Sequence, residues 1–494
     1  MRDAFTLGFV VAALGACAPA SSDTHGGSEA GVDAGPVDPT AALDQRPFGC
    51  HPAVAFGIAD DPWAPAREAG LAWTRGADAP YLFWSLVDPN RTGDPTKMAF
   101  SGTTTGPNGQ SDPFDYDRIH AAVASGLQVM LNIEVEPQAG SFSKPSSWLP
   151  VDEQAYVHFV EAAVKRYPGV RVWQVGNEPN ISFDAGRADF AKLQKLTFET
   201  IKNADPGAVV VMGGVAGNMG TRDENDTYFD TVLDELGGCC VDVFDLHFYG
   251  DSKGGTTGDG PGQRLLGYHD FEDVARFYRA RLDTRGYAAT RIWTTENGTP
   301  SGTWKMGPET LSATEAEQAR DLVKRYVVAL ASGVDKVFWA FGMTEGFGVW
   351  DDDYFDHTGL LYAGHGAPAG TKKLAYWSLW QMTRKLDGCD WRKVERLATT
   401  VDETRAYRCP RQGGGAIVVA WWDTFRVSGY QAGQTAQLTV PWTSATAVVY
   451  PALPADATGA AVDPATAFPA TALSPDGGQV TLTLGADPIF LRAD

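Results

Sequence analysis

Residues 170–180 read VRVWQVGNEPN, and residues 190–204 read FAKLQKLTFETIKNA. The first segment is an apolar run that ends at glycine and proline, which is typical of a buried β-strand. In the second segment apolar residues recur at every third or fourth position, which predicts an amphipathic helix. Together they form one strand–helix unit, the repeating element of a parallel sheet covered by helices.

The same alternation extends in both directions, from about residue 51 to residue 386. Eight strand–helix units predict an α/β fold of the (β/α)8 TIM-barrel type. An open, doubly wound sheet is the alternative, but no glycine-rich phosphate loop follows the first predicted strand. The predicted strands are Ala53–Ile58, Leu71–Gly76, Gln128–Ile133, Val170–Val175, Val209–Gly213, Val243–His247, Arg291–Thr295 and Lys336–Phe341, and the predicted helices include Tyr156–Tyr167, Phe190–Ala204, Phe271–Arg285 and Ala313–Ser332.

The longest predicted loops lie near residues 85–112, 135–150, 250–268 and 342–370. Each of them follows the C-terminal end of a predicted strand. In a barrel this is the face on which active sites form. We therefore expect the functional residues of this chain on these loops and at the strand ends beside them.

After the helical segment Lys372–Leu386 the pattern changes to short β-rich runs separated by Gly, Pro, Asp and Thr turns. We predict that the barrel spans residues 49–387 and that residues 388–494 form an all-β sandwich domain. The predicted strands of this domain include Ala416–Trp422, Ala436–Val440, Ala447–Val449 and Val480–Leu484.

The first residues have the pattern of an export signal. A charged start leads into an apolar stretch too short to span a bilayer, and the stretch ends in Leu14-Gly15-Ala16-Cys17. This ending resembles the lipobox of bacterial lipoproteins, which implies a signal peptide over residues 1–17 and a lipid on Cys17. The alternative is an ordinary signal peptide. Residues 18–48 are rich in small and polar residues and are predicted to be a disordered linker.

Composition limits the partners of the chain. Hydrophobic residues make up 44% and charged residues 20%, as in globular proteins, and the net charge is −21. A strongly acidic protein repels nucleic acid and anionic lipid, so a neutral substrate fits best. We expect no nucleic-acid partner, and contact with a membrane only through the lipid on Cys17. The expected location is therefore the periplasm or the cell surface.

Cysteine usage agrees with export, because disulfides persist in oxidising compartments. Cys389 and Cys409 flank one short segment and are predicted to pair. Cys50 is a candidate partner for either Cys239 or Cys240, and whichever of these two does not pair with Cys50 would remain a free thiol. The spacings match no zinc motif.

Two glutamates directly follow predicted strands. Glu178 lies in the turn after the fourth strand, and Glu296 lies in Thr295-Glu296-Asn297-Gly298 after the seventh. Burying an unpaired carboxylate costs several kcal/mol, so a glutamate at the end of a buried strand needs a functional reason. Two carboxyl groups at one cleft push their pKa values apart, which lets one act as an acid while the other stays ionised. This pair is what glycosidic bond cleavage requires.

Asn-Glu-Pro after the fourth strand, with a second glutamate after the seventh, resembles clan A of the glycoside hydrolases. The resemblance implies that Glu178 is the acid/base and Glu296 the nucleophile of a retaining enzyme, and that Asn177 binds the sugar 2-hydroxyl. It covers the whole barrel region. No metal or organic cofactor is expected. The resemblance also implies supporting roles for His247, Tyr249 and Arg75, and a role as a sugar platform for Trp339.

Within the clan, VWQVGNEPN and the trailing β-domain most resemble families 39 and 5. The specificity stays open among xylosides, glucans and mannans, because loop residues select the sugar. The alternative function is a catalytically inactive surface lipoprotein that binds carbohydrate. Such a protein would normally lack one of the two glutamates, and both are present. The sequence therefore favours a retaining β-glycosidase that acts on oligo- or polysaccharides by double displacement.

Overall fold

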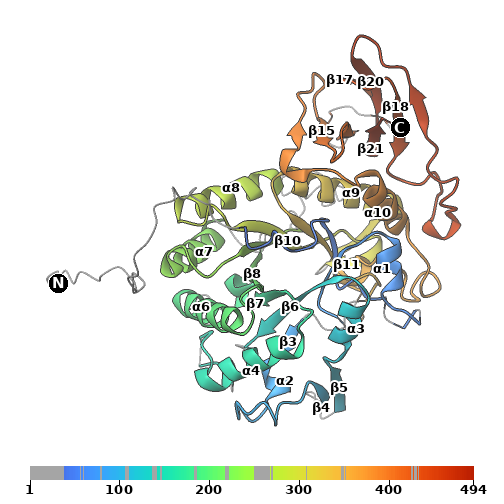
Figure 1. Cartoon of the computed structure of the whole chain (residues 1–494). Helices are drawn as coiled ribbons and strands as arrows, with labels where there is room; N and C mark the ends of the chain where they lie inside the picture. Colours follow the sequence, from blue (N-terminus) through green and yellow to red (C-terminus); the bar gives the residue numbers. More distant parts are fainter. Residues whose placement is uncertain are drawn as a thin grey trace, which may run out of the picture. The chain divides into compact units, whose positions relative to one another are not determined.

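The computed structural model describes residues 38–494 except 56, 59, 78–80, 106–110, 136–141, 145–146, 183–185, 217–221, 250–267, 269–270, 307–308, 347–349, 351, 424–426, 428–430, 432 and 494. Residues 38–494 form one compact unit (Figure 1). The predicted signal peptide, Cys17 and residues 18–37 of the predicted linker lie outside the described residues. The compact unit begins within the predicted linker, because the Asp38 carboxylate forms ion pairs with Arg291 and Arg392.

Eight parallel strands close into a barrel, which confirms the predicted fold. The ring runs β1-β2-β6-β7-β8-β9-β10-β13 and returns to β1, and the β2–β6 pairing closes it on one side. The strands are β1 Phe48–His51, β2 Trp73–Arg75, β6 Gln128–Glu134, β7 Val172–Val175, β8 Val209–Ala216, β9 Val243–His247, β10 Arg291–Asn297 and β13 Lys336–Ala340.

Helices surround the ring (Figure 1), and two of them, α4 and α9, begin at sequence-encoded caps. The Asp152 side chain accepts the Ala155 N–H at the start of α4, and Thr314 forms a capping box with Glu317 at the start of α9. The helices are α1 Ala64–Glu68, α2 Trp84–Val87, α3 Arg118–Ala124, α4 Glu153–Arg166, α5 Pro179–Ser182, α6 Arg187–Ala204, α7 Arg222–Leu236, α8 Phe271–Thr284, α9 Glu315–Ala331 and α10 Leu374–Lys385.

The inside of the barrel is filled by apolar side chains from neighbouring strands around the ring. Trp73, Trp293 and Phe338 are fully buried, and the Trp73 and Trp293 rings meet edge to face with centroids 5.3 Å apart. They belong to one cluster with Met130 and valines of β7, β8 and β9. Because this cluster fills the interior, polar side chains at the C-terminal strand ends have room only on top of it.

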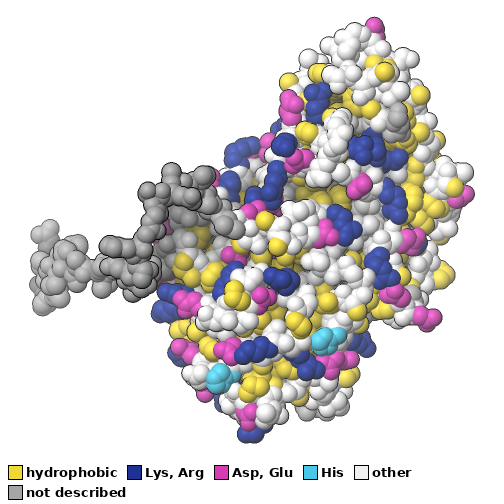
Figure 2. Space-filling view, in the orientation of Figure 1, with side chains coloured by type: hydrophobic (Ala, Val, Ile, Leu, Met, Phe, Trp, Pro, Cys, Tyr) yellow, Lys and Arg dark blue, Asp and Glu magenta, His cyan; other side chains and the backbone are white. Residues whose placement is uncertain are grey.

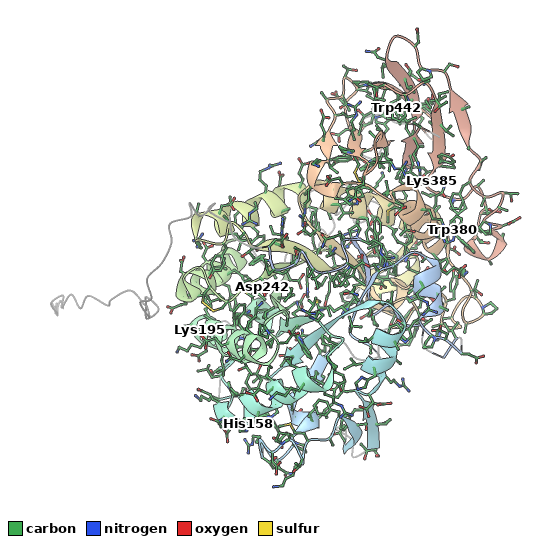
Figure 3. All side chains as sticks on the ribbon, viewed as in Figure 1. His158, Lys195, Asp242, Trp380, Lys385 and Trp442 are labelled. Atoms are coloured by element: carbon green, nitrogen blue, oxygen red, sulfur yellow. A yellow bond between two sulfur atoms is a disulfide. The ribbon has the colours of Figure 1, made fainter. Side chains whose placement is uncertain are left out.

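Residues after α10 form sheets without α-helices among the described residues. Leu438 and Leu482 of the smaller sheet share a buried cluster with Val418 and Leu491 of the larger one, so the two sheets face each other. Trp442 of this cluster lies among these strands, whereas Trp380 and Lys385 lie on α10 (Figure 3). The larger sheet has the order β14 Glu395–Arg396, β15 Thr404–Pro410, β16 Ala416–Trp422, β21 Ile489–Arg492, β18 Ala447–Pro451 and β19 Thr471–Leu473, and the smaller pairs β17 Ala436–Pro441 with β20 Gln479–Leu484.

One predicted strand is wrong. Residues 53–58 do not form a strand where they are described, and the first barrel strand is β1, which lies just before them. Pro52 has no N–H to give to a sheet, so the ladder ends at His51. Elements that the sequence did not predict are β3 Tyr81–Phe83, the hairpins β4 Ser101–Thr105 with β5 Ser111–Asp115 and β11 Gly302–Met306 with β12 Glu309–Ala313, and the 3₁₀ turns η2 Phe355–His357, η3 Trp391–Lys393 and η5 Gly459–Ala461.

The disulfides differ in part from the prediction. Cys389 pairs with Cys409 as predicted, but Cys239 pairs with its neighbour Cys240. Cys50 is a free, buried thiol on β1, where its Sγ lies 3.3 Å from the Pro52 carbonyl oxygen. Its predicted pairing with Cys239 or Cys240 is therefore wrong. Burial raises the pKa of the Cys50 thiol, so the thiol stays protonated.

Surface charges of both signs are interspersed on the face shown in Figure 2, where acidic and basic side chains alternate with apolar ones. Many of them pair, as Lys165 does with Glu161 along α4. Within the described part of the chain, the helices are all too short or too polar to cross a bilayer.

Candidate active site

Glu178 and Glu296 reach one region from two strand ends. Glu296 is the sixth residue of β10, and Glu178 follows β7 by a turn in which Gly176 has a φ of 68° and Glu178 itself a φ of 43°. A positive φ is unusual for a glutamate and is a strain that active sites often carry. Asn180 fixes the turn, because its side chain accepts the Ala216 N–H at 3.1 Å.

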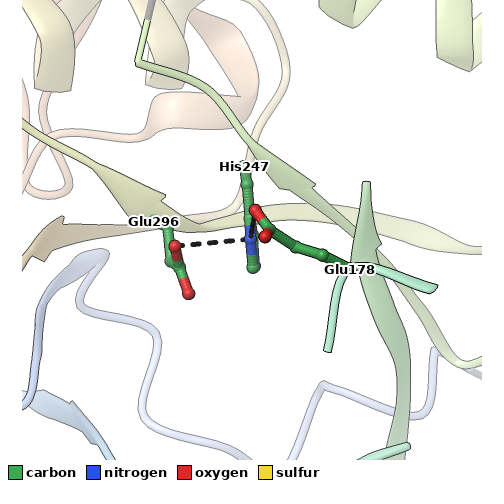
Figure 4. Close-up of side chains that lie close together, drawn as sticks. All are labelled: Glu178, His247 and Glu296. Atoms are coloured by element: carbon green, nitrogen blue, oxygen red, sulfur yellow. Dashed lines mark hydrogen bonds and ion pairs between the residues drawn. The ribbon is translucent and has the colours of Figure 1, made fainter. Parts of the chain in front are cut away.

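His247 lies between the two glutamates (Figure 4). Its Nδ1 is 2.8 Å from Glu178 Oε1 and 3.4 Å from Glu296 Oε2. The histidine is the last residue of β9, which pairs directly with β10 in the ring, and its side chain is 1% exposed. The same nitrogen thus contacts both carboxyl groups.

Two further donors hold Glu296. Arg75, which ends β2, donates from Nη1 to Glu296 Oε1 at 2.5 Å, and the Tyr249 hydroxyl donates to Oε2 at 2.9 Å. Arg75 also donates from Nη2 to Asn177 Oδ1 at 2.7 Å. The Arg75 side chain is fully buried, so its charge is little screened by water. The sequence-predicted residues Asn177, Glu178, His247, Tyr249, Glu296 and Arg75 therefore meet at one place.

Burial sets the electrostatics of the site. It raises the pKa of Glu296, and the positive charges of His247 and Arg75 oppose that rise. Burial alone would lower the pKa of His247, but the charges of Glu296 and Asp245 raise it to about 10. Burial and the charges of Glu296 and Glu178 hold the pKa of Tyr249 well above its usual value. Tyr249 is therefore a neutral donor, and the carboxyl groups around His247 favour its protonated form.

Trp339 is not placed at the site surface. It is 0% exposed and donates from Nε1 to the Thr358 carbonyl oxygen at 2.8 Å. Side chains alternate along β13, so Phe338 fills the barrel interior while Trp339 joins Val337 in the surrounding core. A fully buried indole offers no face to a sugar, and the predicted platform role of Trp339 is corrected on this ground.

Other aromatic residues line the site instead. Phe341 stacks on Tyr249 with ring centroids 6.2 Å apart and an interplanar angle of 25°. Phe355 in η2 meets the Tyr249 ring at 5.4 Å and the Phe341 ring at 5.0 Å, both edge to face. Both phenylalanines belong to the segment after Trp339, in or next to a loop predicted to reach the site, but nothing in the sequence distinguishes them from core residues.

A buried polar layer beneath the site was also missed. Asp245, Gln174 and Thr295 are all 0% exposed, and Asp245 Oδ2 accepts hydrogen bonds from Gln174 Nε2 and from the Thr295 hydroxyl. Asp245 is two residues before His247 on the same strand, so both side chains point to the same face. In the sequence, only this two-residue spacing pointed to Asp245 as a residue of the site, and it does so only once His247 is known to face the site.

One group of described residues has the arrangement of a metal site. Potential ligand atoms of Glu178, His247 and Glu296 lie within 4.8 Å of one another. A cation bound there would lie next to the Arg75 guanidinium, which already contacts Glu296 Oε1. His247 Nδ1 is also engaged with Glu178. The group is therefore better suited to proton transfer than to metal binding.

A family profile covers most of the site. The profile of Cellulase (glycosyl hydrolase family 5) matches residues 97–343, half of the chain. The chain belongs to glycosyl hydrolase family 5. The resemblance to clan A is thereby confirmed, and membership of a glycoside hydrolase family implies a carbohydrate substrate. The match contains Glu178, His247, Tyr249 and Glu296, whereas Arg75 lies before it.

Solved structures of glycosidases share the fold of this family 5 chain. A family 39 glycoside hydrolase from the gut symbiont Bacteroides cellulosilyticus WH2 is 18% identical, with a TM-score of 0.58 over 93% of this chain and 82% of that one. A glucosidase from Croceicoccus marinus is 16% identical, with a TM-score of 0.57 over 91% and 96%. CelM2, a bifunctional glucanase-xylanase from a metagenome library, is 14% identical, with a TM-score of 0.53 over 91% and 96%. A search of curated proteins by sequence finds no match.

Proposed function

We propose that this chain is a retaining β-glycosidase, with Glu178 as acid/base and Glu296 as nucleophile. The observation that carries the proposal is the short separation of the two carboxyl groups, whose oxygens approach within 4.8 Å of each other. Retaining glycosidases hold their carboxyl groups about 5–5.5 Å apart, whereas inverting ones leave about 6.5–9.5 Å for a water. The separation here leaves no room for that water.

The surroundings of each glutamate support its role. Glu296 is 3% exposed and receives hydrogen bonds from Arg75 and Tyr249, which orient both of its oxygens. A fixed, ionised carboxylate is what attack on an anomeric carbon needs. The Glu178 side chain is 20% exposed, so it can exchange a proton with water between the two steps.

The reaction then runs in two displacements. A Glu296 oxygen attacks the anomeric carbon while protonated Glu178 gives its proton to the departing oxygen, which breaks the glycosidic bond and forms a glycosyl ester on Glu296. Glu178, now ionised, takes a proton from a water that attacks the same carbon. The ester bond breaks, and the sugar leaves with its original configuration.

A neutral oligo- or polysaccharide is the proposed substrate. Phe341, Phe355 and Tyr249 give the site an aromatic side, and aromatic faces stack on the C–H faces of pyranose rings. The net charge of −21 disfavours an anionic polymer. Glucans, xylans and mannans are the classes to test.

Hydrolysis of aryl β-glycosides and β-glycans by wild type, Glu178→Ala and Glu296→Ala tests the proposal. We expect Glu296→Ala to be inactive, and Glu178→Ala to cleave only substrates with good leaving groups. Azide should restore Glu178→Ala and give a β-glycosyl azide. An α-glycosyl azide would show that the wild-type reaction inverts. Sugar binding by a wild type that cleaves nothing would support the inactive binding protein instead.

We also propose that the chain is exported and tethered by a lipid on Cys17. The lipobox-like LGAC sequence and the Cys389–Cys409 disulfide support this. In a bacterial host fed a radiolabelled fatty acid, the wild type should carry the label and sediment with membranes. Cys17→Ser should lose both properties. A labelled Cys17→Ser protein, or an unlabelled wild type, would contradict the tether.

A further inference from the structure

His247 is surrounded by more acceptors than a neutral imidazole can satisfy. Its Nδ1 faces Glu178 and Glu296, and its Nε2 lies 3.2 Å from Asp245 Oδ2 and 3.1 Å from Thr295 Oγ1. The Thr295 hydroxyl donates its proton to Asp245 Oδ2 at 2.5 Å, so it offers only a lone pair to Nε2. A neutral histidine has one N–H, and only the imidazolium donates from both nitrogens.

Asp245 is fixed as an acceptor by the chain of contacts behind it. Arg75 donates from Nε to Gln174 Oε1 at 2.8 Å, so the amide group of Gln174 must point its Nε2 toward Asp245 Oδ2, 2.6 Å away. The Thr295 backbone N–H donates to Asp245 Oδ1 at 3.0 Å. An arginine has no acceptor atom, so this order of donors and acceptors cannot reverse. Both oxygens of Asp245 thus accept hydrogen bonds at 0% exposure, an arrangement that a positive charge beside it stabilises.

We infer that Asp245 is a positioning residue that holds His247 doubly protonated between Glu178 and Glu296, and that the charge of His247 keeps the buried Glu296 carboxylate ionised. The first part of this inference concerns only the protonation of His247. The second part deepens the function proposed above and rests on it, because it gives the ionised Glu296 its role as nucleophile.

The other charged or titratable groups around His247 are Arg75 on β2, His51 on β1 and Tyr249 after β9. Burial and the charge of Arg75 hold the pKa of His51 well below its usual value, so His51 is neutral. Tyr249 is neutral as well. Arg75 repels a second cation, and the three carboxyl groups at positions 178, 245 and 296 outweigh it. His247 is also the largest of the influences that oppose the burial-driven rise in the pKa of Glu296.

Nitrogen NMR of the full-length protein labelled with ¹⁵N-histidine tests the first part directly. The chain has eight histidines, and comparison with His247→Gln assigns the signal. In the wild type at pH 7 both ring nitrogens of His247 should have the shifts of an imidazolium. In Asp245→Asn the histidine should become neutral at a lower pH than in the wild type. A neutral His247 in the wild type at pH 7 would overturn the inference, whatever the variant does.

Kinetics test the second part. Loss of charge on His247 should raise the pKa of Glu296, so the acidic limb of kcat/KM for Asp245→Asn should move up by about one pH unit, a tenfold loss on that limb. The matched control is Asp88→Asn, which removes a carboxylate that is 1% exposed and accepts hydrogen bonds from Thr92 and Gly93 away from the site. The control should move neither the limb nor the His247 signal.

The two readouts separate the two proposals. A folded Asp245→Asn variant with the wild-type His247 titration and the wild-type acidic limb overturns the role of Asp245. If the NMR spectra show that His247 is an imidazolium that depends on Asp245, but the protein hydrolyses no glycoside, the first part is supported and the proposed function is contradicted. If Asp245→Asn does not fold, the wild-type spectrum still decides whether His247 is charged.

Discussion

At the scale of single residues, removal of the Tyr249 hydroxyl tests how the surrounding donors hold Glu296. Tyr249→Phe removes a donor 2.9 Å from Glu296 Oε2 that lowers the pKa of this buried carboxyl group. The pKa of Glu296 should therefore rise, and the acidic limb of the kcat/KM profile should move to higher pH. A hydrogen bond to a charged group contributes about 1.5–3 kcal/mol, so kcat/KM should fall by roughly 10- to 100-fold.

The control is Tyr156→Phe, which removes a buried tyrosine hydroxyl from α4 that bonds Thr197 instead. It should leave the pH profile unchanged. An equal effect of both substitutions would mean that the loss reflects general destabilisation.

The residues of the site were predictable from sequence where a motif fixed them. Asn177 and Glu178 follow one strand and Glu296 is the penultimate residue of another, and the barrel brings strand ends together whatever the loops do. Trp339 shows the limit of this reasoning. Side chains along a strand point alternately to its two faces, so the direction of Trp339 follows from the inward direction of its neighbour Phe338. In a buried strand both faces carry apolar residues, so the sequence does not reveal which residues point inward.

At the scale of elements, strands of the barrel were predicted because both of their faces are buried and they form continuous apolar runs. β1 was missed because its four residues, FGCH, are fewer and less apolar than the segment that follows. The hairpin strand β4, SGTTT, was assigned to a loop because small polar residues carry no two-residue apolar alternation.

The short turn η2 yields a prediction of its own. Phe355 is 37% exposed, and it and Val151 are the large apolar residues classed as exposed in the described part of the chain. Thr358 holds it in place, since its hydroxyl donates to the Phe355 carbonyl oxygen and accepts the Phe341 N–H, each at 2.8 Å. A fixed, exposed aromatic ring beside Tyr249 suits the apolar face of a sugar.

Phe355→Ala should therefore raise KM for oligosaccharides by roughly 2- to 10-fold, from about 0.5–1.5 kcal/mol of lost aromatic contact, with little change in kcat. Val151→Ala removes a similarly exposed apolar side chain just before α4 and should change neither constant. A fall in kcat for Phe355→Ala with KM unchanged would instead mean that the ring acts through Tyr249.

At the scale of the whole molecule, buried charges tie the C-terminal sheets to the barrel. Lys324 on α9 contacts Asp423, which follows β16, at 3.0 Å, and both side chains are almost fully buried. Asp423 also accepts hydrogen bonds from Trp421 Nε1 and from the Tyr268 hydroxyl, just before α8. Because barrel helices supply part of this contact, the β-rich lobe in Figure 1 should not unfold independently of the barrel.

Asp423→Asn should lower the free energy of unfolding by about 3–5 kcal/mol, because it leaves the Lys324 ammonium buried without its ion-pair partner. Glu161→Gln is the matched control, since it breaks an ion pair on α4 whose side chains are 65% and 38% exposed, and such pairs contribute at most about 0.5 kcal/mol. Urea unfolding followed by tryptophan fluorescence and by circular dichroism measures both. The two probes should give one coincident transition in wild type and variant. Two separate transitions, of which Asp423→Asn shifts only the earlier, would contradict this prediction. They would mean that the sheets fold on their own and that this contact does not join them to the barrel.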